Sequence, residues 1–211
     1  MQPIEAILFE PVGCLAEFPP EPFQEIAAQL FGRRRQPSKS GSRSYWHLLN
    51  LMEAASETCM VETLEMEAVA GASLYEDVLP AASELRSLGV KLLIASSLSS
   101  SAVRHFLEAR GLAGFFGEVW TRDNSGGIKA ATLKSALATT RSERAIYLTD
   151  TAEGLKAAKS AGINAVLMMN DPDEARRLAL RNPAGGIVSL HELPDFVRVV
   201  VAQLASSQEV G

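Results

Sequence analysis

The chain has 211 residues, enough for one sizeable domain or for one domain with a small insertion. Apolar residues make up 47% of it, and the net charge of −5 argues against a general binder of nucleic acid or of anionic membranes. No apolar run approaches the ~20 residues of a membrane-spanning helix, and the cysteines, Cys14 and Cys59, have no metal-ligand spacing and fit a reduced cytoplasmic protein.

Five short apolar runs predict the strands of a parallel sheet. They are rich in Ile, Leu and Val and carry few charges, which is typical of strands that are buried on both faces. In chain order, these runs are Ile4–Phe9, Val90–Ala95, Ala145–Leu148, Asn164–Met168 and Ile187–Leu190.

Amphipathic helical patterns alternate with these runs. Apolar faces with helical spacing begin at Val78, Val103, Leu133 and Ala152, and a fifth runs from Leu193 to Leu204. Alternating strands and helices predict an α/β fold with a doubly wound parallel sheet.

The segment between the first strand and the helix at Val78 is too long for a simple connection. It holds helical patterns that start at Phe23 and Tyr45, and a third over Val61–Ala70. We therefore predict a small α-helical cap inserted at residues 16–74, with the core formed by residues 1–15 and 75–211. Within the cap, the run Arg33-Arg34-Arg35 is either a solvated connection or a patch that attracts phosphate to a cleft.

Four segments carry polar residues at predicted strand ends or loops, where ligands bind to open parallel sheets. These segments are Glu10-Pro11-Val12-Gly13-Cys14-Leu15, Ser96 with the following Ser97, Gly126-Gly127-Ile128-Lys129, and Tyr147-Leu148-Thr149-Asp150-Thr151. Their order and positions resemble the motifs of the haloacid dehalogenase-like (HAD) hydrolase superfamily. The enolase-phosphatases of methionine salvage are the most similar branch, and the phosphoglycolate-phosphatase-like branch is nearly as similar.

The resemblance implies a role for each of these residues. Glu10 stands at the position of the family's nucleophilic Asp, and Lys129 at that of a Lys which balances the charge of the nucleophile and the phosphate. Ser96, Ser97 and Lys129 are expected to bind phosphate, and the N-terminus of the helix after Ser97 suits an anion. Glu10, the carbonyl oxygen of Val12 and Asp150 could hold Mg²⁺ weakly.

Three positions depart from the family pattern. Glu10 replaces the nucleophilic Asp, Val12 replaces the general acid/base, and Gly154 stands where a second acid usually follows Asp150. Moving the attacking oxygen by more than ~1 Å can cost ~10²-fold in rate, and losing a positioned general acid costs ~10²–10⁴-fold. Cys14 is interpreted as a packed small residue rather than a substitute nucleophile, because no basic residue is evident beside it.

These departures leave several functions open. The chain is expected to be a HAD-like hydrolase relative with weak or no Mg²⁺-dependent phosphatase activity. The alternatives are a non-catalytic protein that binds a small phosphorylated metabolite or a protein partner, a haloacid-dehalogenase-type hydrolase that uses Glu10, and a structural remnant without a ligand. The cap offers Tyr45, Trp46 and His47 as candidate contacts, each of which is more often core or surface, and the sequence gives neither the substrate nor the oligomeric state.

Overall fold

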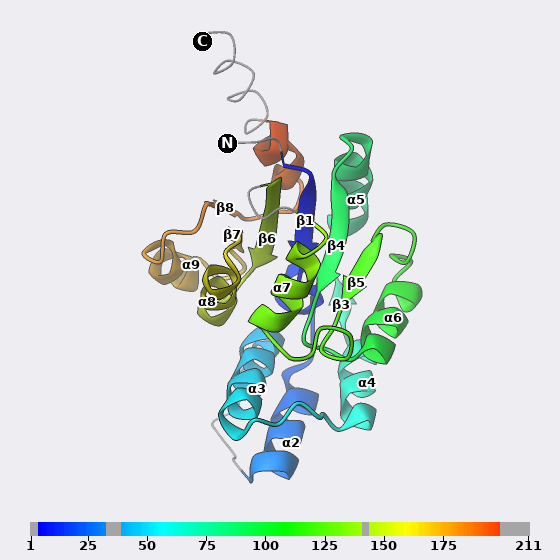
Figure 1. The fold of residues 1–211 in the computed structure, drawn as a ribbon, viewed down its shortest axis with the longest axis vertical. Coiled ribbons are helices and arrows are strands. Elements are labelled where there is room, and N and C mark those ends of the chain that lie inside the picture. Colours follow the sequence, from blue (N-terminus) through cyan, green and yellow to red (C-terminus); the bar gives the residue numbers. More distant parts are fainter. Residues whose placement is uncertain (1–3, 33–38, 141–143, 199–211) are drawn as a thin grey trace.

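The fold is a six-stranded parallel sheet between two layers of helices, with a group of three helices beyond one end of the sheet (Figure 1). The computed structural model describes residues 4–32, 39–140 and 144–198. The order of the strands is β5-β4-β1-β6-β7-β8, so the first strand lies in the middle of the sheet. The predicted α/β class with a doubly wound parallel sheet is confirmed.

Every neighbouring pair in the large sheet is parallel, and the register fixes which strand ends lie side by side. On β1, Phe9 pairs with Ile94 on one side and with Leu148 on the other. The strands are β1 (Ala6–Phe9), β4 (Lys91–Ala95), β5 (Glu118–Trp120), β6 (Ala145–Thr149), β7 (Asn164–Met168) and β8 (Gly185–Ile187).

Helices cover both faces of this sheet because each strand must cross over before it pairs again in parallel. One layer contains α7 (Ala130–Leu137) and α8 (Ala152–Ala161), which pack against each other, followed by α9 (Pro172–Ala179). The other layer contains α5 (Val78–Ser87) and α6 (Ser100–Ala109). The helical residues 192–198 return to α5, where Arg198 pairs with Glu84 at 2.6 Å.

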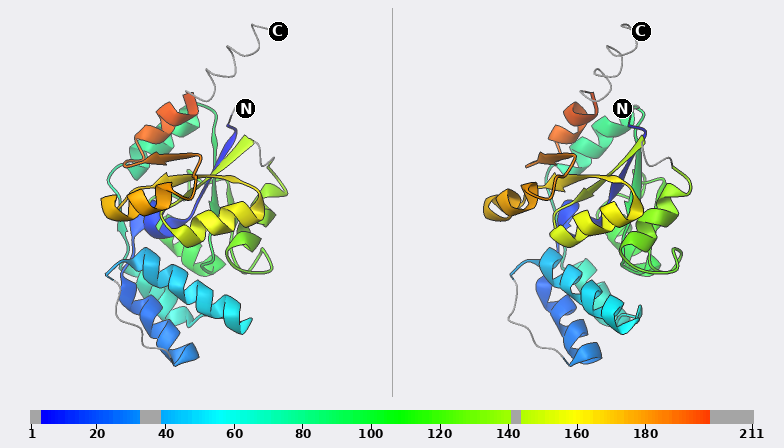
Figure 2. Two further views of the ribbon diagram at one scale, coloured as in Figure 1. Left: turned by 90° about the vertical axis from the view of Figure 1, so that its left-hand side faces the viewer. Right: turned by 60° about the vertical axis from the view of Figure 1, so that its left-hand side comes forward.

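Three further helices lie beyond the carboxyl ends of the strands (Figure 2). They are α2 (Pro20–Phe31), α3 (Gly41–Ala55) and α4 (Glu62–Ala70). The chain enters and leaves this group through two short strands, β2 (Ala16–Glu17) and β3 (Ser73–Leu74), which pair antiparallel. We call α2, α3 and α4 the cap helices; the division into a core and a cap domain at residues 16 and 74 stays a prediction.

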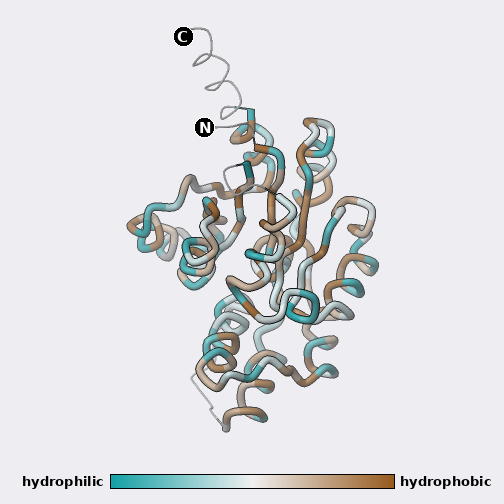
Figure 3. The backbone as a smooth tube through the Cα atoms, viewed as in Figure 1, coloured by the Kyte–Doolittle hydropathy of each residue, from teal (hydrophilic) through white to brown (hydrophobic). Residues whose placement is uncertain are grey.

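The core is concentrated on the central strands. Figure 3 shows the middle of the sheet as hydrophobic, while the outer turns of the helices alternate between hydrophobic and hydrophilic. All four residues of β1 are buried, as are all five of β6. These strands therefore read as continuous apolar runs because both of their faces are covered.

Several elements differ from the sequence prediction, which included neither the short strands β2 and β3 nor the helix α9. The run predicted as a strand over Ile187–Leu190 forms the strand Gly185–Ile187 instead, because the Asp77 carboxylate accepts hydrogen bonds from the Ser189 hydroxyl and the Leu190 amide, both at 2.7 Å. The strand β5 was not predicted, since it has only three residues and each is half-buried.

Some sequence expectations fall outside the described residues. The arginine run Arg33-Arg34-Arg35 does, and so does the part of the last predicted helix beyond residue 198. Among the described helices, none is long and apolar enough to cross a membrane.

Candidate functional site

The sheet brings three of the predicted site residues to one edge. Glu10 directly follows β1, Ser96 follows β4 and Asp150 follows β6. Because β1 lies between β4 and β6, the carboxyl ends of these three strands are neighbours. Lys129 lies at the same end of the sheet, immediately before α7.

The Glu10 carboxyl group is buried at this edge, with the residue only 2% exposed. The Ser96 hydroxyl donates to Glu10 Oε1 at 2.5 Å, and the Tyr45 hydroxyl donates to Glu10 Oε2 at 3.3 Å. Burial raises the pKa of this carboxyl from its usual 4.5 to about 8, against the hydrogen bonds from Ser96, from Tyr45 and from the backbone amides of Val12 and Ser97. The group is therefore mostly protonated at pH 7.

Tyr45 of the cap covers this carboxyl group from the side opposite to the sheet. Its hydroxyl lies 3.4 Å from Ser96 Oγ as well as within reach of Glu10, and the residue is fully buried. Its ring packs against Phe23 with centroids 5.1 Å apart and against Trp46 at 6.0 Å. This aromatic packing fixes the ring of Tyr45 over Glu10, where the side chain excludes water.

Lys129 contacts the core through its backbone and the cap through its side chain. Its backbone amide donates to Ser97 Oγ at 2.7 Å, which ties the loop before α7 to the end of β4. Its ammonium group, however, donates to Asn50 Oδ1 at 2.6 Å and to Glu53 Oε2 at 2.8 Å, both on α3. The charge of Lys129 is thus paired with a cap carboxylate in this arrangement.

Asp150 lies at the end of β6 and also contacts the cap. Its Oδ1 accepts a hydrogen bond of 2.8 Å from the Ser42 hydroxyl on α3. Its other side faces Gly13, where an added Cβ would lie 2.3 Å from Asp150 Oδ2. Gly13 has φ +83°, a conformation that favours glycine, so the backbone after Glu10 can pass close to this carboxylate.

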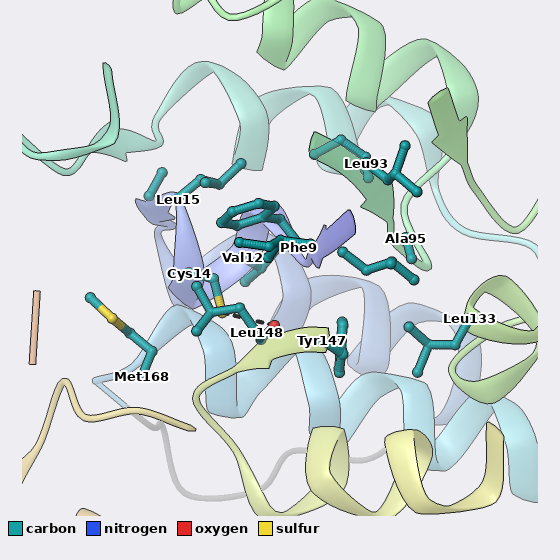
Figure 4. Packing of buried hydrophobic residues seen from close by; sticks show 14 of the residues in the cluster. Phe9, Val12, Cys14, Leu15, Leu93, Ala95, Leu133, Tyr147, Leu148 and Met168 are labelled. Atoms are coloured by element: carbon teal, nitrogen blue, oxygen red, sulfur yellow. Dashed lines mark hydrogen bonds between the residues drawn. The ribbon is translucent and has the colours of Figure 1, made fainter. Parts of the chain in front are cut away.

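Val12 and Cys14 belong to the apolar core rather than to an open site. Figure 4 shows both among the buried side chains around β1 and β6, with the Cys14 thiol donating to the Leu148 carbonyl at 3.5 Å. Burial, with the nearby charge of Asp150, raises the pKa of the Cys14 thiol well above its usual range. Cys14 is therefore a packed, unreactive residue.

The donor set does not fit a Mg²⁺ ion in this arrangement. Mg²⁺ requires near-octahedral oxygen ligands and ionised carboxylates. The Glu10 carboxyl is buried and turned toward Ser96 and Tyr45, whose hydroxyls donate to both of its oxygens, and the only other ligands expected were Asp150 and the carbonyl oxygen of Val12. Among the described residues, no group of three acidic, histidine or cysteine side chains is placed to hold a metal.

Gly154, the third departure from the family's sequence pattern, is explained by the lack of space for a side chain at this position. A Cβ at this position would lie 1.8 Å from Thr149 Oγ1 and 2.8 Å from Thr149 Cβ. Thr149 is buried at the end of β6, and the Gly154 amide donates to the Thr151 hydroxyl that begins α8. A second acid cannot be accommodated here unless Thr149 changes too.

A buried ion pair between the cap and the core was not predicted from the sequence. Arg122, in the loop after β5, donates to both carboxylate oxygens of Glu65 on α4, at 2.6 and 2.8 Å. The Glu65 carboxylate also accepts from the Ser99 amide at 2.8 Å. The Glu65 side chain is fully buried and that of Arg122 is 10% exposed. No local signal in the sequence distinguishes this pair from solvated charges.

An open pocket of about 350 Å³ lies on the outer side of Asp150, between the start of α3 and the end of β7. It is separate from the buried carboxyl group, since Glu10, Ser96 and Tyr45 do not line it. Its lining combines charges of both signs with an apolar floor and includes Lys39, Arg43, Asp150, Asp171, Met168 and Leu178.

The sequence profile described as haloacid dehalogenase-like hydrolase matches residues 37–168. That range holds Ser96, Lys129 and Asp150 but begins after Glu10 and Val12, which carry two of the three departures. No protein in a search of curated sequences matches the chain significantly.

Solved structures with the same fold cover nearly the whole chain. A predicted phosphatase from Clostridium acetobutylicum has a TM-score of 0.68 at 16% identity, covering 93% of this chain and 99% of its own. A haloacid dehalogenase-like hydrolase from Streptococcus pneumoniae has a TM-score of 0.66 at 17% identity, with 92% and 98% covered. CbbY from Rhodobacter sphaeroides, solved with phosphate, has a TM-score of 0.64 at 22% identity, with 90% and 96% covered. At these identities, the likeness shows the fold alone.

Proposed function

Since the chain belongs to the family of haloacid dehalogenase-like hydrolases, we propose that it is a member whose site hydrolyses phosphate esters weakly or not at all. The observation that carries the proposal is the state of Glu10, which is buried and hydrogen-bonded at the position of the family's nucleophile. A protonated carboxyl has no free charge with which to attack phosphorus, because nucleophilic catalysis by Glu requires the carboxylate.

Two further observations support a low rate. Lys129, expected to balance the charge of the nucleophile and the phosphate, directs its ammonium group to Glu53 on α3. Val12 supplies no group that can exchange a proton with a leaving group. We propose that Mg²⁺ binds weakly at most, because it would first require Glu10 to ionise and turn away from Ser96. A cytoplasmic location stays part of the proposal.

Small-molecule binding without turnover is a second candidate, favoured by the pocket beside Asp150. Lys39 and Arg43 line this pocket at the start of α3, and Arg43 pairs with Asp171 across it at 3.5 Å. A phosphorylated metabolite that displaces Asp171 is the class of ligand that these cations would attract. The buried Glu10 carboxyl group takes no part in this binding. Thermal-shift measurements with phosphate esters should then show stabilisation that Arg43→Ala weakens.

The test of the main proposal is a hydrolysis panel of phosphate esters and 2-haloacids, with and without Mg²⁺. Wild-type protein is compared with Glu10→Gln, which keeps the shape of the side chain but cannot ionise. We expect equal rates, near the background, in both proteins. Turnover by wild type far above the background that disappears in Glu10→Gln would overturn the proposal and make Glu10 a catalytic carboxylate. The substrate turned over would then distinguish a phosphatase from a haloacid-type hydrolase.

A further inference from the structure

The two edges of the large sheet differ in how they are protected. At one edge, the Asn124 side chain donates to the Val119 carbonyl of β5 at 2.9 Å, and Glu118 brings a charge into that strand. At the other edge, β8 pairs with β7 alone, and among the described residues no strand lies on its outer side (Figure 1). Proteins usually protect such edges with charged residues, prolines or covering segments. The strand β8 itself contains neither a charge nor a proline.

The chain around β8 is exposed and uncharged. No Asp, Glu, Lys or Arg occurs from residue 182 to residue 190. Ala184, Gly186 and Val188 are exposed at alternate positions along the strand and its two ends, so they share one face. Val188 is 65% exposed, and Leu180, just after α9, is 84% exposed. An apolar patch therefore lies beside an open strand edge, a combination that marks an interaction surface.

The amide and carbonyl groups of Gly186 face outward at this edge. On the inner side, the Ile187 carbonyl accepts a hydrogen bond of 2.8 Å from the Met169 amide. Because neighbouring residues of a strand direct their amide and carbonyl groups to opposite sides, those of Gly186 point away from β7. Two residues that lie opposite each other in an antiparallel pair can exchange both N–H···O bonds. Gly186 can therefore pair with Gly186 of a second copy across a two-fold axis.

Such a pairing brings opposite charges together. A two-fold axis reverses the strand direction, so the chain before β8 in one copy runs beside the chain after β8 in the other. Residues 176–184 carry three arginines and no acid, whereas residues 188–197 carry two acids and neither arginine nor lysine. The surface is therefore complementary in charge to a second copy of itself.

The position of Glu192 supports this complementarity. Its carboxylate accepts from the amides of Val188 and Ser189, at 3.0 and 3.1 Å, which hold it at the end of β8. Counted from Gly186, Arg181 and Glu192 lie almost equally far along the chain in opposite directions. Across the two-fold axis, Arg181 of each copy therefore comes close to Glu192 of the other.

We propose that the outer edge of β8 is an interface between two copies of this chain, which pair antiparallel through Gly186 and join their sheets into one. The contacts across it are the paired Gly186 residues, Ala184 against Val188, and Arg181 against Glu192. A second copy fits better than an unrelated acidic partner, because the same segment supplies both the basic and the acidic side. The inference does not depend on Glu10 and holds whether or not the chain hydrolyses an ester.

Sedimentation equilibrium of the full chain over a wide range of protein concentration tests the interface. We expect wild type to form a dimer. Val188→Lys should lower the association constant by roughly tenfold or more, because it brings an unpaired charge into an apolar contact. Arg181→Glu should weaken the dimer as well, because it places like charges together. Leu79→Lys is the matched control, since Leu79 is 40% exposed on α5, away from this edge, and should associate as wild type does.

Hydrogen exchange of the Gly186 amide locates the contact. This amide should exchange rapidly in dilute wild type and in Val188→Lys, and slowly in concentrated wild type. A wild type that stays monomeric at all concentrations, or a dimer that Val188→Lys and Arg181→Glu leave unchanged, would overturn the inference. A Gly186 amide that is protected at every concentration would overturn it too, because another part of the chain would then cover the edge.

Discussion

The Glu10 carboxyl group takes its protonation state from its surroundings. It lies in a water-excluded space in which four donors are not enough to offset the cost of removing a charge from water. A carboxyl in such a place keeps its proton at neutral pH, as general acids in apolar pockets do. Under the proposed function, this group lies at the position where the family needs an ionised nucleophile.

This protonation makes the stability of the fold depend on pH. Between about pH 4.5 and 8 the unfolded chain has lost the Glu10 proton while the folded chain keeps it, so unfolding releases a proton. Rising pH therefore lowers the free energy of unfolding by about 1.4 kcal/mol per pH unit over this window. The total loss is a few kcal/mol and is complete above pH 8. Urea unfolding of wild type and Glu10→Gln at pH 5, 7 and 9 measures it. The difference in free energy of unfolding between the two proteins should change by that amount. Free energies that depend on pH in the same way for both proteins would contradict a buried, protonated Glu10.

Gly13 allows a second test at the scale of one residue. In Gly13→Ala, an alanine must adopt a φ of +83°, and its Cβ would lie 2.3 Å from the Asp150 carboxylate. Gly111→Ala is the matched control, because Gly111 has φ +68° and nothing within 4 Å. Both variants should lose ~1–2 kcal/mol from the backbone conformation. Gly13→Ala should lose a further ~1–3 kcal/mol through overpacking. Equal losses in urea unfolding would show that Asp150 does not lie against Gly13.

The residues differ in how far the sequence could predict their surroundings. Glu10, Ser96, Lys129 and Asp150 could be located, since each follows or precedes a recognisable element. The contact of Tyr45 with Glu10 could not be found, because Tyr45 shares one apolar helix face with Leu48, Leu49 and Met52. Only the docking of α3 over the sheet distinguishes this tyrosine from a core residue.

At the scale of elements, three helices of the cap are each held to the core by polar contacts or aromatic packing. Helix α3 contributes Tyr45, Ser42 and the partners of Lys129, and α4 contributes Glu65. Helix α2 packs Phe23 against Tyr45 of α3 and against Phe18, whose ring in turn contacts Phe106 of α6 in the core. These contacts hold the cap over Glu10, so the strength of cap docking controls access to it.

The ion pair of Glu65 with Arg122 is expected to contribute most to this docking. Glu65→Gln leaves the buried guanidinium without its carboxylate, which typically costs ~3–5 kcal/mol. Asp173→Asn is the control, since the exposed pair of Asp173 with Arg176 should contribute no more than ~1 kcal/mol. Hydrogen exchange of α4 and urea unfolding should both show a large effect for Glu65→Gln alone. A cap that is equally protected in both variants would contradict this role.

Helices and strands with a clear apolar period could be predicted from the sequence, while short, half-buried ones could not. The strands of the sheet centre and the helices α5 to α8 each carry a clear apolar period, and their residues agree with the structure to within a few positions. The three residues of β5 are only half-buried, so their sequence carries no such period. At Ile187–Leu190 the apolar pattern continued past the point where contacts with Asp77 end the strand.

For the whole molecule, the fold is that of a hydrolase family, and we propose that the site differs from the family's in its chemistry. The family's profile and the solved structures agree on the architecture. The polar groups at the carboxyl edge have partners within the protein itself. Ser96 and Tyr45 donate to Glu10, and Lys129 pairs with Glu53. The proposed loss of hydrolysis depends on one property of one residue, the protonation of Glu10 in the folded chain.

That property can be measured directly by carbon-13 NMR of the glutamate side-chain carboxyl groups as a function of pH. The Glu10 signal is assigned as the one that is missing in Glu10→Gln. We expect this carboxyl to titrate near pH 8, and we expect Mg²⁺ and phosphate to leave its titration unchanged. A midpoint near 4.5, or a shift to lower pH on adding Mg²⁺, would show an ionised carboxylate that is open to ligands and would contradict a buried, protonated Glu10.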